Sequence, residues 1–312
     1  MITEHFTFKD TGDLEIFVYK WLPNGNVDVK GVVMVAHGMS ETAARYESFA
    51  SYLTENGFIV YANDHRGHGK TAGKTENIGE LGEDGFNSMV ENMHELNERI
   101  KEENNNLPIF LFGHSMGSFL SQRYICLYGK ELSGVMLTGT CGKQGIIIDI
   151  ARLLAKGEIK KIGRGSKSNK LAKLIFGSYN NSFKKNRTDF DWLSRDDKEV
   201  DKYIDDPFCG TVFTAGFYSD FLGGLKNIAD NREIKKIPRD LPIYIFGGDK
   251  DPVGKNGKGV LKLIKTYKEY GIQDLTYKLY KDGRHEMLNE TNKEEVIKHV
   301  IEWLNLHYNV LE

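Results

Sequence analysis

The sequence predicts an α/β fold, in which a mainly parallel sheet of eight strands is flanked by helices and a helical cap is inserted after the sixth strand. Two observations support this prediction. Short apolar runs rich in β-branched residues alternate with longer amphipathic patterns over most of the 312 residues. The alternation stops at residue 141 and resumes after Pro238, as an insertion between two strands would require.

The predicted strands are apolar runs too short for helices. The first two form a hairpin across the turn Thr11-Gly12-Asp13. The third, KGVVMVAH, is apolar almost throughout, which is typical of a strand buried on both faces. In chain order the strands are expected at residues 4–10, 14–22, 30–37, 57–63, 107–113, 133–139, 241–248 and 274–281.

Helices are expected between the later strands. The most regular pattern covers residues 84–104, where apolar residues recur every three or four positions on one face. Thr291 and Glu294 form a capping box that is expected to open the last helix, which runs to about residue 307. The remaining helices are expected at residues 42–56, 116–128 and 257–270.

The break in the alternation divides the chain into two units. Residues 1–140 and 239–312 are expected to form a catalytic domain around the sheet, and residues 141–238 the cap. Residues 141–189 hold nine lysines and three arginines against three acidic residues, a net charge of +9. The first cap helix is expected to end at Gly157, with an apolar face made of Ile146, Ile147, Ile150, Leu153 and Leu154.

Two interpretations of this basic segment remain open. In the first, the helix packs on the catalytic domain and the lysine-rich loop is solvated. In the second, a basic amphipathic surface makes transient contact with anionic lipid, which would place the protein at the periphery of a membrane.

Bulk composition disfavours several classes of protein. With 40% hydrophobic residues the chain can bury a sizeable core, and a net charge of −2 gives no reason to expect nucleic acid as a partner. The N-terminal stretch alternates polar and apolar residues, unlike a secretory signal, and no window reads as a membrane-spanning helix. A cytoplasmic location fits three widely spaced cysteines that form no CxxC pair: Cys126, Cys141 and Cys209.

The sequence GHSMG places a serine where a buried strand is predicted to turn directly into a helix. Such a corner forces its central residue into an unfavourable backbone region, at a cost of about 1–3 kcal/mol. Gly113 and Gly117 remove side chains that would collide there, so Ser115 is presented at the N-terminus of the helix. The pattern predicts a catalytic nucleophile rather than a small residue at a turn.

A nucleophilic serine needs a histidine base and an acid that orients it, each placed after a later strand. His285 is the one histidine after Ser115 that follows a predicted strand, since the other two lie in the final helix. Asp249 and Asp251 both follow the preceding strand. Asp251 is preferred because the proline after it would fix the turn and aim its carboxylate inward, which leaves Asp249 the role of a loop-capping acid.

Acyl transfer also needs two N–H donors for the negative charge that develops on the carbonyl oxygen, each contributing about 2.7–4 kcal/mol. The backbone N–H of Met116 is one candidate, because it directly follows the serine. The N–H of Met39 is the other, because His37-Gly38 lets the loop after the third strand turn over the site.

His65 and His68, in the loop NDHRGHGKT, are three residues apart, a spacing that in a helix would suggest a metal site. Neighbouring glycines oppose the helix that this spacing would need, and no third ligand is apparent. A hydrogen-bonded loop beside the site is therefore expected, and no metal.

Five motifs in one order resemble the α/β-hydrolase superfamily, and within it the monoacylglycerol lipase and lysophospholipase-like serine hydrolases. The resemblance covers residue 30 to the end, and residues 187–210 are similar to the cap of bacterial members. One departure is that Met39-Ser40-Glu41-Thr42 stands where the family often has a glycine and then Glu-His. The motifs are HGMSETAARYESFA (37–50), DHRGHGKT (64–71), GHSMGS (113–118), GGDKDPVG (247–254) and GRHEMLNE (283–290).

This resemblance implies a triad of Ser115, Asp251 and His285, an oxyanion hole formed by Met39 and Met116, and a mobile cap over an acyl-binding pocket. The expected activity is hydrolysis of fatty-acid esters, such as monoacylglycerols or lysophospholipids, without a metal or an organic cofactor. Two alternatives remain open. An aminopeptidase or amidase with the same triad would need a carboxylate that grips an amino group, and a ligand-binding protein without the chemistry would not react with a fluorophosphonate.

Overall fold

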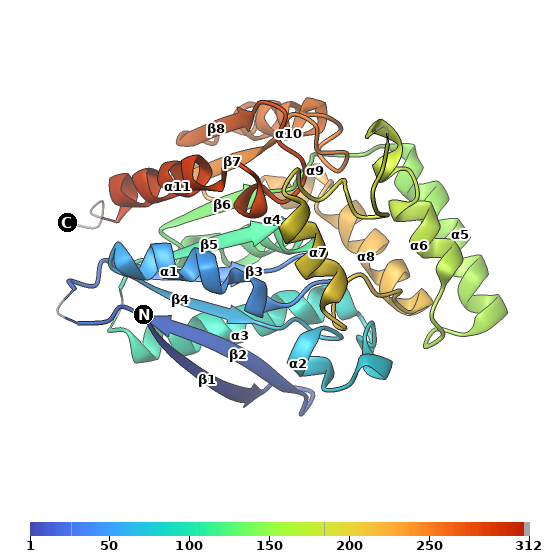
Figure 1. Ribbon diagram of the computed structural model, residues 1–312, viewed down its shortest axis with the longest axis horizontal. Coiled ribbons are helices and arrows are strands. Elements are labelled where there is room, and N and C mark those ends of the chain that lie inside the picture. Colours follow the sequence, from blue (N-terminus) through green and yellow to red (C-terminus); the bar gives the residue numbers. More distant parts are fainter. Residues whose placement is uncertain (26, 106, 184, 309–312) are drawn as a thin grey trace.

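The computed structural model describes residues 1–25, 27–105, 107–183 and 185–308. Its centre is an eight-stranded sheet with the order β1-β2-β4-β3-β5-β6-β7-β8 (Figure 1). Strands β3 to β8 are parallel, and β2 is antiparallel to both β1 and β4. The bounds are β1 (Ile2–Lys9), β2 (Glu15–Leu22), β3 (Gly31–Ala36), β4 (Phe58–Asn63), β5 (Ile109–His114), β6 (Gly134–Thr138), β7 (Ile243–Gly248) and β8 (Leu275–Tyr280).

The eight predicted strands are confirmed to within two residues at each end. The predicted fold class, a mainly parallel eight-stranded sheet flanked by helices, is confirmed as well. Because β3, β5 and β7 run in parallel, the loops after their carboxyl ends meet at one edge of the sheet. The predicted site residues lie on these loops or on the loop after β8.

Helices cover both faces of the sheet, and alternate residues of each strand point to opposite layers. Val33 and Val35 of β3 pack under α1 (Glu47–Glu55) and α11 (Lys293–His307). Val32 and Met34 pack on the other face, under α3 (Gly85–Glu103), α4 (Met116–Tyr128) and α10 (Lys258–Glu269). The predicted helix at 42–56 begins as a 3₁₀ turn, Ala43–Tyr46, and continues as α1.

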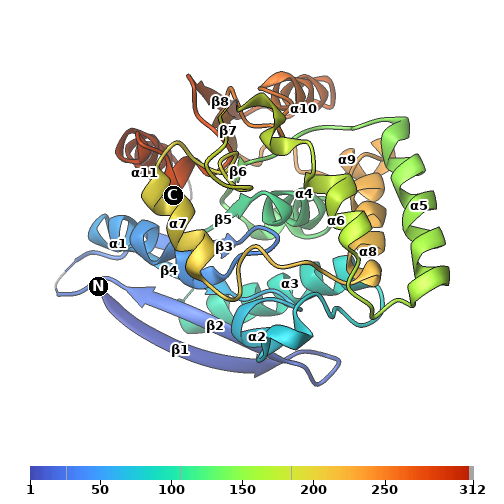
Figure 2. The same cartoon turned by 45° about the vertical axis from the view of Figure 1, so that its right-hand side comes forward.

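We keep the name cap for residues 141–238, in which the described residues form five α-helices and no named strand. The first cap helix lies at the outer edge of the molecule in both views (Figures 1 and 2). A fourth cap helix packs against the sheet domain, where the ring of Phe221 lies 6.4 Å from that of Phe86 and 6.0 Å from that of Phe119, centroid to centroid. The cap helices are α5 (Ile146–Ile162), α6 (Asn169–Phe176), α7 (Asp197–Asp205), α8 (Ala215–Asn227) and α9 (Asn231–Ile234).

The prediction that the first cap helix ends at Gly157 is wrong. The helix continues to Ile162 and ends at Gly163, whose φ of 87° suits glycine. An internal glycine costs a helix only about 1 kcal/mol relative to alanine. Burial of Ala155 and packing of Ile159 against the core outweigh that cost.

The predicted capping box of Thr291 and Glu294 is also wrong. The last helix has Asn292 at its N-cap, and no side chain caps it. The Thr291 N–H donates instead to the carboxylate of Glu290, at 2.9 Å. Thr291 therefore stays in the loop, and the helix begins at Lys293.

Candidate active site

Ser115 occupies the sharp corner between β5 and α4. Its φ of 51° and ψ of −118° lie in a region that residues with side chains rarely adopt. Gly117 is required beside it, since a Cβ there would come within 2.0 Å of the carbonyl oxygen of Ala36. The corner thus presents Ser115 at the carboxyl edge of the sheet, as the sequence pattern predicts.

Two cavities meet at this serine. The aromatic cavity, of about 290 Å³, is lined by His285 and by aromatic side chains such as Trp192 and Tyr203. The aliphatic cavity, of about 330 Å³, runs beneath the first cap helix. Ser115 and Met39 border both cavities. The aliphatic cavity is lined mainly by Phe119, Ile147, Ile148, Leu154, Ile175, Phe221, Leu222 and Leu225.

The structure joins Asp251 to His285. The Nδ1–H of His285 donates to Oδ1 of Asp251 at 2.9 Å, and both side chains are buried. Burial alone would lower the pKa of His285, but the charge and hydrogen bond of Asp251 raise it above its ordinary value. Asp249 lies apart and accepts the N–H of Asp282 at 2.8 Å, which is a loop-capping role.

The loop after β3 closes over the serine. A Cβ on Gly38 would come within 3.2 Å of the Ser115 Cβ, so a glycine is needed at this close approach. The N–H of Met116 lies in the first turn of α4, where the helix supplies no acceptor. Among the described residues, no backbone carbonyl accepts the N–H of Met39. Both predicted oxyanion donors are therefore available.

Two neighbours hold this loop in shape. The carboxylate of Glu41 accepts the Gly38 N–H and, at 2.9 Å, the hydroxyl of Tyr46. The Nε2 of His37 accepts the N–H of His65 at 2.9 Å, so its Nδ1 carries the proton and donates to the Gly38 carbonyl at 2.7 Å. Glu41 therefore holds the His37–Gly38 peptide, and His37 holds the Gly38–Met39 peptide that carries the Met39 N–H.

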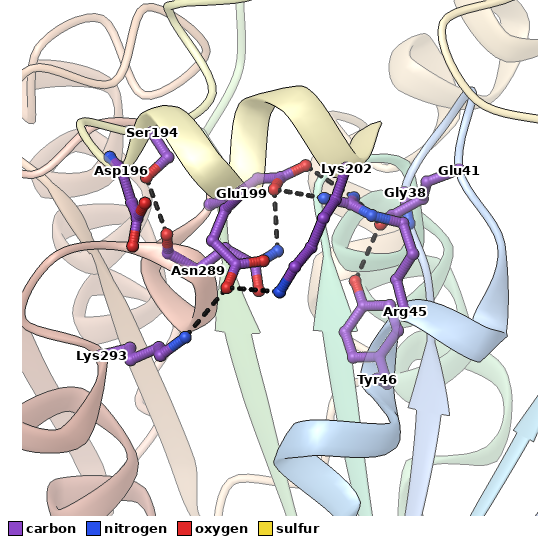
Figure 3. Close-up of polar contacts among 11 residues, drawn as sticks. Gly38, Glu41, Arg45, Tyr46, Ser194, Asp196, Glu199, Lys202, Asn289 and Lys293 are labelled. Atoms are coloured by element: carbon purple, nitrogen blue, oxygen red, sulfur yellow. Dashed lines mark hydrogen bonds and ion pairs between the residues drawn. The ribbon is translucent and has the colours of Figure 1, made fainter. Parts of the chain in front are cut away.

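A buried ion-pair cluster connects the loop after β3 to the loop that carries His285. Figure 3 shows Arg45 beside Glu41, Gly38 and Tyr46. The guanidinium donates to Glu41 at 2.6 Å and to both oxygens of Glu286 at 2.8 and 2.7 Å. Burial raises the pKa of a carboxyl group, but Arg45 overrides this effect and lowers that of Glu286 to about 2. Sequence reasoning missed this cluster.

The cap forms one wall around the histidine. The Trp192 ring lies 4.8 Å from the ring of His285, centroid to centroid. The guanidinium of Arg284 donates to the carbonyl oxygens of Asp191 and, at 2.9 Å, Ser194. We call residues 281–292, between β8 and α11, the histidine loop. The cap thus contacts that loop as well as bordering the two cavities.

The histidines of the loop after β4 are part of the packed interior. The rings of His65 and His68 lie 4.3 and 5.0 Å from that of His37. Elsewhere in the described chain, His94, Glu98 and Glu131 lie close enough to share an ion. Both of those carboxylates pair with Lys101, at 2.6 and 3.1 Å, which offsets part of their negative charge.

Four buried histidines are held in the neutral form. Burial lowers the pKa of His37 and of His114 to about 4. Burial also lowers the pKa of His65 and His68 well below the ordinary value. In the unfolded chain all four would titrate near the reference pH of about 6.5.

The free energy of unfolding is therefore expected to fall as the pH drops below about 6.5. Each histidine that is protonated only in the unfolded chain lowers the free energy of unfolding by about 1.4 kcal/mol per pH unit, and four of them lower it by about 5 kcal/mol per pH unit. Burial raises the pKa of Asp64 to about 6, and Asp251 raises that of His285, so both groups bind protons more tightly in the folded protein and offset part of this loss. Urea unfolding followed by tryptophan fluorescence from about pH 7.5 to about pH 5 measures the slope. A midpoint that does not move with pH would contradict the expectation.

Comparison with known proteins agrees with the geometry. The family described as serine aminopeptidase, S33, matches residues 27–292. A monoacylglycerol lipase from Mycolicibacterium smegmatis is 27% identical over 310 residues, which cover 98% of each chain. A mouse monoglyceride lipase is 27% identical over 293 residues, covering 93% of this chain and 86% of its own.

Solved structures give the same result for the fold. A thermostable carboxyl esterase from Bacillus coagulans, solved with glycerol, superposes with a TM-score of 0.91 at 29% identity, covering 99% of both chains. A monoglyceride lipase variant from Saccharomyces cerevisiae, solved with a substrate analogue, gives a TM-score of 0.76 at 22% identity. That superposition covers 98% of this chain and 96% of the yeast chain.

Proposed function

Because the chain belongs to the serine aminopeptidase (S33) family of the α/β-hydrolase fold, we propose that it hydrolyses carboxylic esters of fatty acids through an acyl-enzyme on Ser115. Monoacylglycerol or a lysophospholipid is the proposed substrate. The names of the relatives support the first of these. The observation that carries the proposal is the strained Ser115 between two cavities, one of which also holds the Asp251-oriented His285.

In the proposed mechanism, His285 takes the proton of the Ser115 hydroxyl as its oxygen attacks the ester carbonyl. Asp251 keeps the proton on Nδ1, so Nε2 is the base, and it stabilises the imidazolium that forms. The N–H groups of Met39 and Met116 hold the oxyanion. The imidazolium then protonates the leaving alcohol, and a water activated by the same ring releases the fatty acid.

The two cavities suggest how the substrate lies. The aliphatic cavity is suited to the acyl chain, since burying a methylene group there contributes about 0.8 kcal/mol. The aromatic cavity also presents polar groups, among them Asn180 and Thr211, and would take the alcohol portion.

An aminopeptidase needs a free carboxylate to bind the substrate ammonium. The aromatic cavity is lined by three acids, Glu41, Glu286 and Asp189. Glu41 and Glu286 are both paired with Arg45, and Asp189 is exposed to solvent. Because both buried acids are already paired and only the solvent-exposed Asp189 is left, the cavity favours an ester over an aminoacyl substrate, although the family takes its name from an aminopeptidase.

We also propose that the outer cap helix meets the lipid phase. Two residues of the predicted apolar face of α5 are largely exposed, Ile146 at 77% and Leu153 at 72%, while Ile147, Ile150 and Leu154 border the aliphatic cavity. Nearby lysines give this segment its positive charge, which suits an anionic membrane surface. Among the described residues, no helix has the length and apolar content needed to cross a bilayer. Three buried free cysteines support a cytoplasmic location.

Hydrolysis rates on a matched panel test this function. We expect kcat/KM on monoacylglycerol, lysophospholipid or p-nitrophenyl acyl esters to exceed that on aminoacyl anilides by at least about 100-fold. We expect faster hydrolysis when the substrate is presented in anionic rather than zwitterionic vesicles, with the difference lost at high salt. Cleavage of aminoacyl anilides at the rate of the esters would reject the ester assignment, and equal rates on both vesicle types would reject the lipid contact.

A further inference from the structure

The cap pairs with the histidine loop along its backbone. We call residues 191–195 the cap anchor. The N–H of His285 donates to the carbonyl of Trp192 at 3.3 Å, and the N–H of Glu286 to that of Leu193 at 2.8 Å. The catalytic histidine therefore receives a backbone contact from the cap, not only from its own domain.

One carboxylate links the two segments. Glu290 is completely buried, and its Oε1 accepts the backbone N–H of Arg284 at 2.8 Å and of Arg195 at 3.3 Å. Its Oε2 accepts the Nε–H of Arg195 at 2.8 Å and the N–H of Thr291 at 2.9 Å. Two donors come from the cap anchor and two from the histidine loop. The two in the loop, Arg284 and Thr291, stand directly before His285 and directly after Glu290.

A buried carboxylate with four N–H donors has little freedom to move, because charge-assisted hydrogen bonds are short and directional. Its position fixes the start of the turn directly before His285. Trp192, in the cap anchor, also contacts the imidazole ring. The 2.9 Å contact between His285 and Asp251 depends on the same loop geometry.

We propose that Glu290 is a positioning residue for His285, which it holds in register by tying the histidine loop to the cap anchor. The cap then has two parts with different roles. The outer helices cover the substrate, and the cap anchor helps to hold His285 in place. The proposal rests on the proposed function, in which His285 is that base.

A second contact between cap and sheet domain offers a matched control. Lys293 of α11 pairs with Glu199 of α7 at 3.0 Å, and Glu199 also pairs with Lys202 (Figure 3). This contact joins the same two parts of the molecule, but through helices that lie outside the histidine loop and the cap anchor. The Lys293 side chain is 31% exposed, much as that of Arg195 is 30% exposed.

The test compares Glu290→Gln and Arg195→Gln with Lys293→Gln. It measures kcat and KM on p-nitrophenyl butyrate and the rate of reaction with a small fluorophosphonate, well below each variant's thermal midpoint. A displacement of about 1 Å in a catalytic group costs about 100-fold. We therefore expect kcat of the first two variants to fall about 10- to 100-fold, with KM changed less than about twofold and phosphonylation slowed in proportion. Lys293→Gln is expected to keep the rates of the unmodified protein.

Unchanged kcat and phosphonylation in the folded Arg195→Gln and Glu290→Gln proteins would overturn the proposal, even if both are less stable. A rise in KM alone would also overturn it, because that would place the effect on substrate binding. Should Glu290→Gln fail to fold, Arg195→Gln decides the question. If the unmodified protein cleaves no ester, the proposed function fails, and the ratio of phosphonylation rates still tests the positioning of His285.

Discussion

Replacing Asp251 by asparagine is expected to lower kcat about 10,000-fold while the protein stays folded. The carboxylate accepts the Nδ1–H of His285 and so leaves Nε2 free to act as the base. An asparagine amide would donate to Nδ1 and favour the opposite tautomer, in which Nε2 carries the proton and cannot accept another. Steady-state hydrolysis of p-nitrophenyl butyrate measures the loss, and circular dichroism checks the fold.

Asp249→Asn is the matched control, since both acids follow β7. Asp249 accepts only the N–H of Asp282 among the hydrogen bonds of the described residues, at 2.8 Å. We expect its replacement to change kcat less than about threefold and to lower stability by about 1 kcal/mol. An equal loss of activity in both variants would mean that Asp251 has no special part in orienting the base.

The sheet could be predicted because its signal is local. Six residues of β3 are completely buried, and a strand buried on both faces must be apolar at every position. The catalytic residues could be proposed from the sequence for a related reason. Each of them follows the end of a strand, and parallel strands bring those ends together whatever the length of chain between them.

The ion pairs next to the site could be predicted from the sequence only in part. Glu41 and Arg45 are four residues apart, a spacing typical of an ion pair on a helix. Glu286 lies 241 residues from Arg45, and no pattern in the sequence connects the two. Glu290 and Arg195 are similarly distant, at 95 residues, because they meet across the boundary between cap and sheet domain.

The cap shows the limit of periodicity as a guide. The pattern correctly indicated an amphipathic helix near residue 146, but periodicity does not say which face packs inward. The structure buries Ile148 and Ala155 and exposes the more continuous face of larger residues, which includes Ile147 and Ile150. Packing against α8, a tertiary contact that the sequence does not encode locally, selects Ile148 and Ala155 as the buried side and leaves Ile147 and Ile150 beside the aliphatic cavity.

Replacing Ser115 by alanine is expected to abolish ester hydrolysis, with kcat reduced about 10,000-fold or more. Without the hydroxyl no acyl-enzyme can form, and only the oxyanion donors and substrate binding remain. Alanine lacks the hydroxyl but fits the same space, so the corner between β5 and α4 should survive. Ser121→Ala, six residues further along the chain in α4, is the matched control and is expected to retain activity, because among the described residues its hydroxyl donates only to the Gly117 carbonyl.

Reaction with a fluorophosphonate followed by peptide mass spectrometry tests the central claim most directly. The account predicts a single phosphonyl adduct on the peptide that contains Ser115, loss of activity in step with labelling, and no adduct on the Ser115→Ala protein. An active protein that remains unlabelled, or that carries its adduct on a different residue, would contradict it.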